Sequence, residues 1–494
     1  MSTSCISCSR ASSGSCRPCS SSAGWPGRSP ATSRSEAPSV RPALTLNSHL
    51  RDLTGPRSPK IRSLASIIGR NAEFWQERDP GMVHVDDING RRVITAQNSP
   101  KGACSVGHVR LSAMIIKRIE KAENVWRAME TAPHVTLHQT YDWARAWATL
   151  PGLSTLVVLV SLDGHPAVLL PLEIVRKFGV RVARLIGSPH SNHNAPLYSE
   201  RFLAEADAAM MDELLDTLSA LNIPADVLAL DKLRPMAGQR EEPLLAFRHV
   251  TSQNASFQLP LKPDFAETLS QINAKRRRKK FRTSERRLEP VGGYRHITAD
   301  DDASARRLLG EFFRQKSLRL TEQGLPDVFA EPGIHDIFGR LASFSANDGA
   351  PVLALHAVEI EDDGVAKLIA IAGLTRKGAH ITCQFGSVDD RTVPDASAGE
   401  LLFYLMIEQA CATGAECFDF GVGDQRYKRS WCPVETPHFD VFLPLNNRGA
   451  MAGRAMAAIV GAKRFVKTSP RMRAIASRIR ALTLNEKPAS EDAG

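Results

Sequence analysis

The sequence has no long apolar run. Its most apolar helical stretch, 450–462, is short and carries Arg454. A membrane-spanning helix needs roughly 18 or more mainly apolar residues, so we expect a soluble protein. The N-terminus is rich in Ser, Cys, Arg and Pro and has no apolar core followed by a small-residue cleavage site. We therefore see no secretory signal and expect a cytoplasmic protein.

Cysteine is scarce outside the first twenty residues. Four of the nine cysteines are Cys5, Cys8, Cys16 and Cys19, and the others are scattered. Two Cys-x-x-Cys pairs can in principle hold zinc as four thiolates. Only seven residues separate these pairs, however, and almost no apolar residues surround them. We therefore expect no metal site, and we interpret the scattered cysteines as core residues in a reducing compartment.

Length and charge set the broad class of protein. The 494 residues are enough for two or three domains with cores of their own. Lys and Arg number 63 against 53 Asp and Glu, and much of the surplus lies in 275–287 and 448–480. Anionic ligands or surfaces are therefore expected partners.

The first half of the chain contains a low-complexity segment and then a predicted domain. Residues 1–110 are rich in Ser, Arg, Pro and Gly without periodicity, so we expect disorder. A helical periodicity of apolar residues begins at Met114. Translation of the native protein from Met114 stays open as an alternative. Residues 111–256 are predicted to form one α/β domain with a hairpin at Asp163-Gly164. Its expected elements are helices at 141–149 and 204–221 and strands at 155–161, 167–175, 181–186 and 226–230.

A second domain is predicted at 257–445, followed by a basic helical tail at 446–494. It opens with a basic helix and repeats the hairpin pattern of the first domain, here around Asp363-Gly364, which is a weak indication of two copies of one fold. The expected fold class is α/β (α+β) with mixed, mostly antiparallel sheets. The expected elements are helices at 263–288, 303–320, 332–346 and 398–413 and strands at 294–297, 352–360, 366–374, 380–388, 417–420 and 440–443, the last completing the sheet of this domain.

Two motifs carry a resemblance to a known family. The segment Cys-Phe-Asp-Phe-Gly-Val-Gly-Asp at 417–424 is followed by Tyr-Lys-Arg-Ser-Trp at 427–431, and Gln-Thr-Tyr-Asp-Trp stands at 139–143. Together with the order of elements, this wording resembles the CelD-like (cellulose biosynthesis) acetyltransferases of the GNAT superfamily. It is more distantly similar to the Fem-type aminoacyl transferases. The resemblance implies two tandem GNAT-like domains, of which the second is catalytic.

The resemblance also implies a reaction and its residues. The chain is expected to transfer an acyl group from acetyl-CoA or another acyl-CoA to an amine or hydroxyl of a polysaccharide, its precursor or a related amine. Such an enzyme must position an activated thioester and move protons. Asp419 and Asp424 are candidate proton acceptors, Tyr427 is a candidate donor to the leaving thiolate, and Lys428 is a candidate ligand for an anionic acceptor or phosphate.

The expected CoA site is the start of the helix at 398–413. Free N–H groups at a helix N-terminus suit phosphate, and Ser397, Ala398 and Gly399 stand there. We add Gln384, on the preceding strand, as a further cofactor-binding candidate. An alternative stays open, in which Ser397 and Glu400 form a capping box that satisfies the same N–H groups internally.

Two further functions stay open. The run of basic residues at 275–282 suits nucleic acid. Apolar residues on the same helix, however, indicate that one face is buried and that the basic face is solvated, where it also meets CoA, an anionic polymer or a membrane surface. We therefore do not expect nucleic acid as a partner. A non-catalytic GNAT scaffold that acts in exopolysaccharide production and a Fem-type transferase that uses aminoacyl-tRNA are the alternatives. The polar loop 188–194, with His190 and His193, is expected to be an acceptor contact or a surface loop.

Overall fold

The computed structural model describes residues 85–88, 91–94, 110–177, 179–346, 350–469 and 472. All of them fall within one compact unit, Pro80–Gly494. The disorder expected for residues 1–110 and the cysteine pairs at 5–19 lie outside the described residues, except for strands β1 and β2 and residue 110. No helix in the described part of the chain has the length and apolar character needed to cross a membrane.

The first sheet is mostly antiparallel. Its order is β1-β2-β3-β4-β5-β6-β8-β19-β11, with β7 beside β5, and only β6 and β8 pair in parallel. The strands are β1 Val85–Ile88, β2 Arg91–Ile94, β3 Leu111–Ile116, β4 Ser154–Leu162, β5 His165–Lys177, β6 Val180–Leu185, β7 Leu197–Tyr198, β8 Val227–Leu233, β11 His249–Thr251 and β19 Phe439–Pro444. A short hairpin of β9 Met236–Ala237 and β10 Arg240–Glu241 stands apart from it.

The second sheet has the order β13-β14-β15-β16-β17-β12-β18. All of its pairs are antiparallel except β16 with β17. Its strands are β12 Ser256–Pro260, β13 Arg295–Thr298, β14 Leu353–Asp362, β15 Val365–Lys377, β16 His380–Val388, β17 Cys417–Val422 and β18 Val434–Thr436. The mixed, mostly antiparallel α/β fold predicted from the sequence is therefore confirmed.

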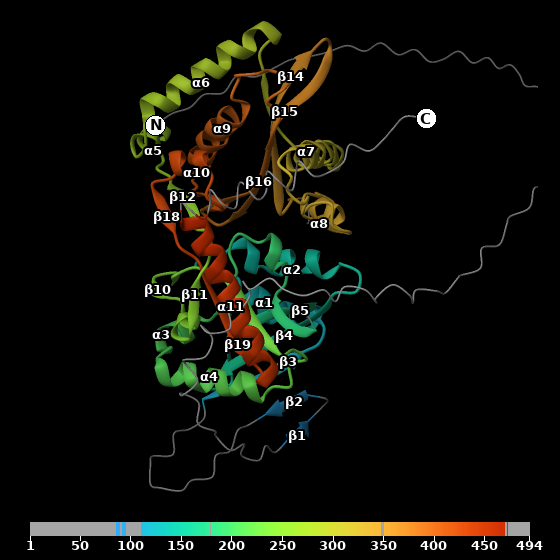
Figure 1. Cartoon of the computed structure of the whole chain (residues 1–494), viewed down its shortest axis with the longest axis vertical. Helices are drawn as coiled ribbons and strands as arrows, with labels where there is room; N and C mark the ends of the chain where they lie inside the picture. The colour runs from blue at the N-terminus through green and yellow to red at the C-terminus, as the bar shows by residue number, and fades with distance from the viewer. Residues whose placement is uncertain are drawn as a thin grey trace, which may run out of the picture. The chain divides into compact units, whose positions relative to one another are not determined.

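Helices cover both faces of the second sheet (Figure 1). The helices are α1 Glu123–Met129, α2 Tyr141–Ala148, α3 Glu200–Glu205, α4 Ala208–Ala220, α5 Phe265–Ser270, α6 Ala274–Leu288, α7 Asp302–Glu322, α8 Ile334–Leu341, α9 Ala398–Ala412, α10 Arg426–Trp431 and α11 Asn447–Thr468. Side chains of α7 and α8 share one core with α1, α2 and both sheets, whereas α5, α6 and α9 pack on the opposite face of the second sheet. A single hydrophobic core thus joins the two halves of the chain.

Both Asp-Gly hairpins predicted from the sequence are present. Asp163 and Asp363 have φ values of 50° and 52°, and the glycines that follow have 80° and 76°. Successive left-handed residues are what a two-residue turn between twisted strands requires. The hairpins β4–β5 and β14–β15 follow from this local chemistry.

Three helix predictions are wrong in their extent or type. The apolar run at Met114 belongs to β3, in which buried Leu111 and Ala113 alternate with partly exposed residues and pair with β4. The helix predicted at 263–288 is two helices, because Asn273 accepts a hydrogen bond from the Arg276 N–H and begins α6 anew. The helix predicted at 204–221 is interrupted in the same way by Asp207, which caps α4.

Two strands differ from the prediction in ways that shape the site. The strand predicted at 440–443 belongs to the first sheet, because Val441 and Leu443 are buried in its core and β19 pairs with β8. Strand β12, which the sequence reading missed, lies between β17 and β18 in the second sheet. Its alternating buried residues, Phe257 and Leu259, are the signal that could have identified it.

Candidate active site

The parallel strands β16 and β17 pair only at one end and then diverge. Their register runs from His380 opposite Cys417 to Thr382 opposite Asp419, although both strands continue beyond this point. The side chain of Asn192, from the first half of the chain, bridges the gap. Its Oδ1 accepts from the Val422 N–H at 3.0 Å, and its Nδ2 donates to Gln384 Oε1 at 3.0 Å. The gap is therefore held open by an amide from outside the second sheet.

A cavity of about 580 Å³, here called the strand-gap cavity, opens between the diverging strands. Strands β15, β16 and β17, the start of α9, helix α10 and the C-terminal half of α7 all line it. Its size is that of a ligand pocket. Polar and aromatic side chains meet in it, among them Gln384, Phe385, Phe403, Tyr427 and Lys428.

The start of α9 is not closed by a capping box. Ser397 has a left-handed backbone with φ of 53° and its side chain makes no capping hydrogen bond. Glu400, the expected partner, turns away and accepts from Arg277 Nη1 at 2.5 Å and from Trp431 Nε1 at 3.1 Å. Among the described residues, none accepts a hydrogen bond from the N–H groups of Ala398 or Gly399. The alternative in which Ser397 and Glu400 cap each other is therefore wrong.

Gly399 lies against the end of β16. A Cβ at this position would stand 2.7 Å from Val388 Cγ2, closer than real contacts allow. Ser397, Gly399 and Glu400 all line the strand-gap cavity, so the α9 N-terminus faces it. The binding of CoA by Ser397, Ala398 and Gly399 stays a prediction, and the geometry adds a packing role for Gly399.

Tyr427 and Lys428 are both fixed by neighbours in the cavity wall. The Tyr427 ring stacks on Phe403 with centroids 5.2 Å apart, and burial raises the pKa of its hydroxyl well above the ordinary value. Lys428 is 5% exposed, and its Nζ donates to the carbonyl oxygens of Gly421 at 3.2 Å and Val422 at 2.9 Å. Burial lowers the pKa of Lys428 to about 8. Lys428 is thus a buried, oriented ammonium.

Asp419 is fully buried and already saturated with donors. Its carboxylate accepts from Arg234 Nη2 at 2.6 Å, Gln258 Nε2 at 2.9 Å and the Gly421 N–H at 2.7 Å. Burial alone would raise the pKa of Asp419, but His380, with Nε2 3.4 Å from Oδ2, and the charge of Arg234 hold it well below the ordinary value. A carboxylate with such low proton affinity is a poor general base, so this environment opposes the predicted role.

Asp424 lies in a different environment from the one predicted. It forms an ion pair with Arg429, which also binds both carboxylate oxygens of Glu435. Asp424 is not among the residues that line the strand-gap cavity. Its catalytic role stays a prediction without geometric support.

Gln384 connects the second sheet to the polar loop of the first half. Its Oε1 accepts from His138 Nε2 at 2.8 Å as well as from Asn192, and its Nε2 donates to the His190 carbonyl oxygen. The loop 188–194 is largely buried, so the surface-loop alternative is wrong. Asn192 was noticed only as part of this polar cluster, and nothing in the sequence pointed to His138 or Arg234 as partners of the site.

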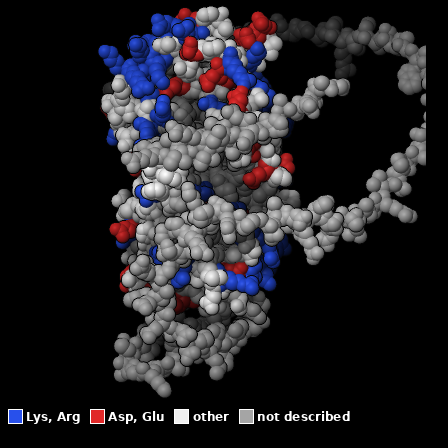
Figure 2. All heavy atoms as spheres, in the orientation of Figure 1, with Lys and Arg blue, Asp and Glu red and all other residues white. Residues whose placement is uncertain are grey.

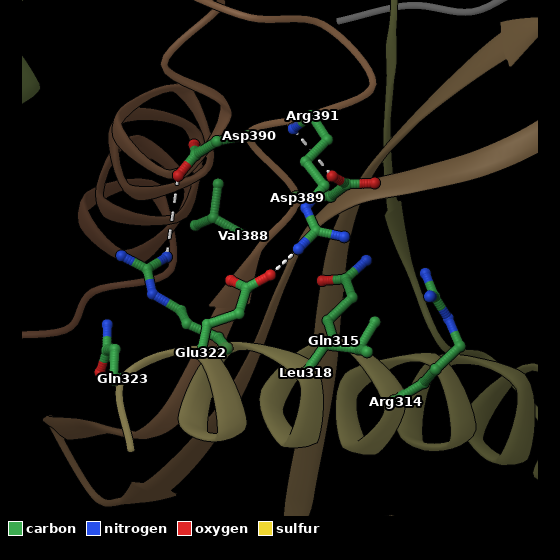
Figure 3. Close-up of a pocket in the computed structure, with 10 residues that line it drawn as sticks. Arg314, Gln315, Leu318, Glu322, Gln323, Val388, Asp389, Asp390 and Arg391 are labelled. Carbon is green, nitrogen blue, oxygen red and sulfur yellow. Dashed lines mark hydrogen bonds and ion pairs between the residues drawn. The ribbon is translucent and has the colours of Figure 1, made fainter. Parts of the chain in front are cut away.

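A smaller cavity of about 340 Å³ adjoins the first (Figure 3). It lies between α7 and the segment after β16, and it shares Arg319, Gln323, Val388 and Asp390 with the strand-gap cavity. Figure 3 shows the ion pair of Arg391 with Glu322 across it. Arg319 forms a second ion pair, with Asp390 at 3.8 Å. Arg319, which is paired with Asp390, therefore places one guanidinium where the two cavities meet.

Helix α6 presents a basic outer face. Figure 2 shows Lys and Arg side chains gathered over the end of the molecule where Figure 1 places α6. Arg277 is the exception, because it is 2% exposed and its guanidinium lies 4.0 Å from the ring centroid of Trp431. The remaining exposed basic residues of this helix include Lys275, Arg276, Arg278 and Lys279.

One family model matches the part of the chain that holds this site. Residues 275–429 match the model of a family described as "Acetyltransferase (GNAT) domain", and this segment contains the strand gap, α9 and the start of α10. This segment, less than half of the chain, is therefore similar to a GNAT acetyltransferase domain. No curated protein matches the chain.

Three solved structures are among those that match the chain. FemX is 13% identical, with 66% of this chain and 96% of that chain covered and a TM-score of 0.47. The C-terminal domain of a putative lysylphosphatidylglycerol synthetase from Agrobacterium fabrum is 11% identical, with 69% and 97% covered and a TM-score of 0.42. A tandem GNAT protein from the clavulanic acid biosynthesis pathway is 10% identical, with 68% and 99% covered and a TM-score of 0.37.

Proposed function

We propose that the protein is an acyl-CoA-dependent acyltransferase that binds its donor, acetyl-CoA or another acyl-CoA, in the strand-gap cavity. The observation that carries the proposal is the divergence of β16 and β17 beside an uncapped helix N-terminus in a matched GNAT domain. The cavity of about 580 Å³ has room for an extended chain rather than a single small group.

The α9 N-terminus is the proposed phosphate site. The N–H groups of Ala398 and Gly399 and the positive end of the helix dipole favour an anion. Glu400 is the only carboxylate in the first turn of α9, and Arg277 and Lys280 neutralise it. Arg319, at the junction with the smaller cavity, is a further proposed contact for the phosphates.

The cavity residues support proton transfer to the leaving group. A thiol has a pKa of about 8.5, so a group of similar pKa exchanges a proton with its thiolate at little cost. Lys428, with a pKa lowered to about 8, has that match. Tyr427, whose pKa is raised, is suited to donating a hydrogen bond to the sulfur and not to losing its proton. We propose Lys428 as the acid and Tyr427 as its positioning neighbour.

We further propose the substrate class and compartment suggested by the CelD-like resemblance. The acceptor is an amine or hydroxyl of a polysaccharide, its precursor or a related amine. The cytoplasm is the proposed location, because the described cysteines, Cys383, Cys411, Cys417 and Cys432, are all free thiols, as expected in a reducing compartment.

Calorimetric titration with acetyl-CoA tests the proposal. We expect micromolar binding to the wild-type protein and at least tenfold weaker binding to Ser397→Asp, because the new carboxylate repels phosphate and competes for the same N–H groups. Ser199→Asp, a matched change at the cap of α3, should leave binding unchanged.

Each other result has a defined meaning. Absence of binding to acetyl-CoA and to longer acyl-CoAs would overturn the proposal and favour the scaffold. Salt-sensitive RNA binding through α6, together with aminoacyl transfer, would instead favour the Fem-type alternative.

A further inference from the structure

A third cavity, of about 360 Å³, lies between the two halves of the chain. Loops of the first half and the edge of the second sheet both contribute to it. Its polar lining includes His134, His193, Arg234, Glu242, Lys377 and His380. We call it the inter-half cavity.

Several polar groups around this cavity are buried without a partner. His193 is 5% exposed, and no described residue hydrogen-bonds to its ring. The side chain of His134 is 4% exposed, and its Nε2 is without a partner although Nδ1 contacts Glu200. The Nε of Arg234 is likewise unpaired, while its Nη2 is bound to Asp419. Buried polar groups in native proteins are nearly always hydrogen-bonded, so the convergence of these three groups points to a ligand that satisfies them.

The inter-half cavity adjoins the strand-gap cavity. Asn192 lines the strand-gap cavity and His193, the next residue, lines the inter-half cavity. On β16, His380 lines the inter-half cavity and Gln384 lines the strand-gap cavity. Successive Cα atoms are about 3.8 Å apart, so one loop and one strand form the wall between the cavities. A molecule in the inter-half cavity therefore lies next to the strand-gap cavity, across the loop that carries Asn192 and His193.

The charges of the cavity favour a ligand with an anionic group. Arg234 offers an unused N–H, and half-buried Lys377 adds a second cation. The negative charge of Glu242 offsets these two cations only in part. Burial raises its pKa to about 7, and it accepts a hydrogen bond from Tyr198.

We propose that the inter-half cavity binds the acceptor, a small primary amine that carries an anionic group, with Arg234 and Lys377 binding the anion and His193 accepting the proton. This inference rests on the proposed acyltransferase function. His193 has an uncharged ring, because burial and the charge of Arg234 lower its pKa well below the ordinary value. An anionic group bound nearby raises that pKa and makes the imidazole a better base.

The reaction balances with the residues described. The amine nitrogen attacks the thioester carbonyl carbon, so a C–N bond forms and the C–S bond breaks. The nitrogen loses one proton to His193, and the sulfur leaves as a thiolate that takes one proton from Lys428. The two residues then restore their protonation states by exchange with solvent, and the products are an amide and free CoA.

Three probes that share an aminoethyl group test the ligand class. Ethanolamine is without an anionic group, β-alanine carries a carboxylate, and O-phosphoethanolamine carries a phosphate. Thiol release from acetyl-CoA is measured with each probe and the full chain. We expect kcat/KM at least tenfold higher with one or both anionic amines than with ethanolamine, and the better of the two identifies the anion. Equal rates, or no rate with either anionic amine while acetyl-CoA binds, would overturn the assignment.

Variants test the residues separately from the donor site. His193→Gln should lower kcat at least 100-fold, and Lys377→Gln should raise KM for the anionic amine about tenfold, with acetyl-CoA affinity unchanged in both. His165→Gln, in the exposed β4–β5 hairpin, is the matched control. Normal turnover by His193→Gln would overturn the role of His193 as the proton acceptor. Absence of acetyl-CoA binding to the wild-type protein would instead contradict the proposed function itself.

Discussion

Arg277 and Glu400 form a buried ion pair, with 2.5 Å between Nη1 and Oε2, that ties the basic helix α6 to the first turn of α9. Arg277 also donates to the Ser430 carbonyl oxygen and stacks on Trp431 in α10. One guanidinium thus contacts two of the helices that border the strand-gap cavity, α9 and α10, and it holds the carboxylate of Glu400 away from the proposed phosphate site.

The first prediction concerns this pair. Arg277→Leu leaves Glu400 with only Lys280 as an ionic partner, and breaking a buried pair costs about 3–5 kcal/mol. We expect a loss of about 3 kcal/mol in the free energy of unfolding by urea denaturation. Arg278→Leu, an exposed neighbour on the same helix, should change it by less than about 0.5 kcal/mol. Similar losses in both variants would show that the pair has no special role.

The second prediction concerns the pH dependence of acyl transfer. Lys428 with a pKa of about 8 is protonated below that pH and loses its proton above it, so kcat should fall as pH rises through about 8. Lys428→Gln should have a kcat at least tenfold lower and no descending limb. Lys316→Gln, which changes another buried lysine of the cavity, should keep the limb. A limb that persists in Lys428→Gln would exclude Lys428 as the acid.

The third prediction concerns stability and Glu242. The unfolded chain releases this proton near pH 4.5, whereas the folded protein retains it to about pH 7. The folded state therefore binds more protons in this interval, and the contribution of Glu242 to stability is lost as pH rises from 4.5 to 7. One pKa unit corresponds to about 1.4 kcal/mol, so the loss is up to about 3 kcal/mol.

Urea denaturation at pH 5 and pH 7.5 measures this effect. Glu242→Gln keeps an oxygen that accepts from Tyr198 and the Leu244 N–H but cannot ionise. The variant should gain stability relative to the wild-type protein at pH 7.5 only. An equal difference at both pH values would be inconsistent with a raised pKa.

The fourth prediction compares two glycines of α11. A Cβ at Gly449 would stand 1.6 Å from the Asp226 carbonyl oxygen, whereas one at Gly461 would meet nothing within 4 Å. Gly449→Ala should therefore lower the melting temperature strongly and detach α11 from β8. Gly461→Ala should raise stability by about 0.5–1 kcal/mol, because alanine is the better helix former. Thermal unfolding of both variants checks the contrast, and a neutral Gly449→Ala would disprove close packing.

The sequence predicted the local features of the fold well. The Asp-Gly turns and strand β16 followed from turn chemistry and from periodicity, which act over a few neighbouring residues. Helix caps at Asp207 and Asn273 follow similar rules, but the basic and apolar patterns run through both breaks and concealed them. The position of β19 depends on which core buries Val441, and no local pattern encodes that choice.

The candidate site was predicted only in part. Tyr427 and Lys428 do line the strand-gap cavity, as do Ser397, Gly399 and Gln384. Asp419 is a predicted proton acceptor, but Arg234, whose contact opposes that role, lies 185 residues away in sequence. Long-range pairing of this kind sets the pKa of a carboxylate. A local sequence motif does not show which distant residue makes that pair.

The return of β19 to the first sheet affects how the chain must fold during synthesis. Strand β8 receives its antiparallel neighbour from residues 439–444, after all strands of the second sheet have been translated. Until then, the first sheet leaves the ribosome with an open edge of unpaired N–H and carbonyl groups, which can pair with other chains. The two halves are therefore completed together, late in translation, and a fragment ending before β19 exposes an edge prone to aggregation.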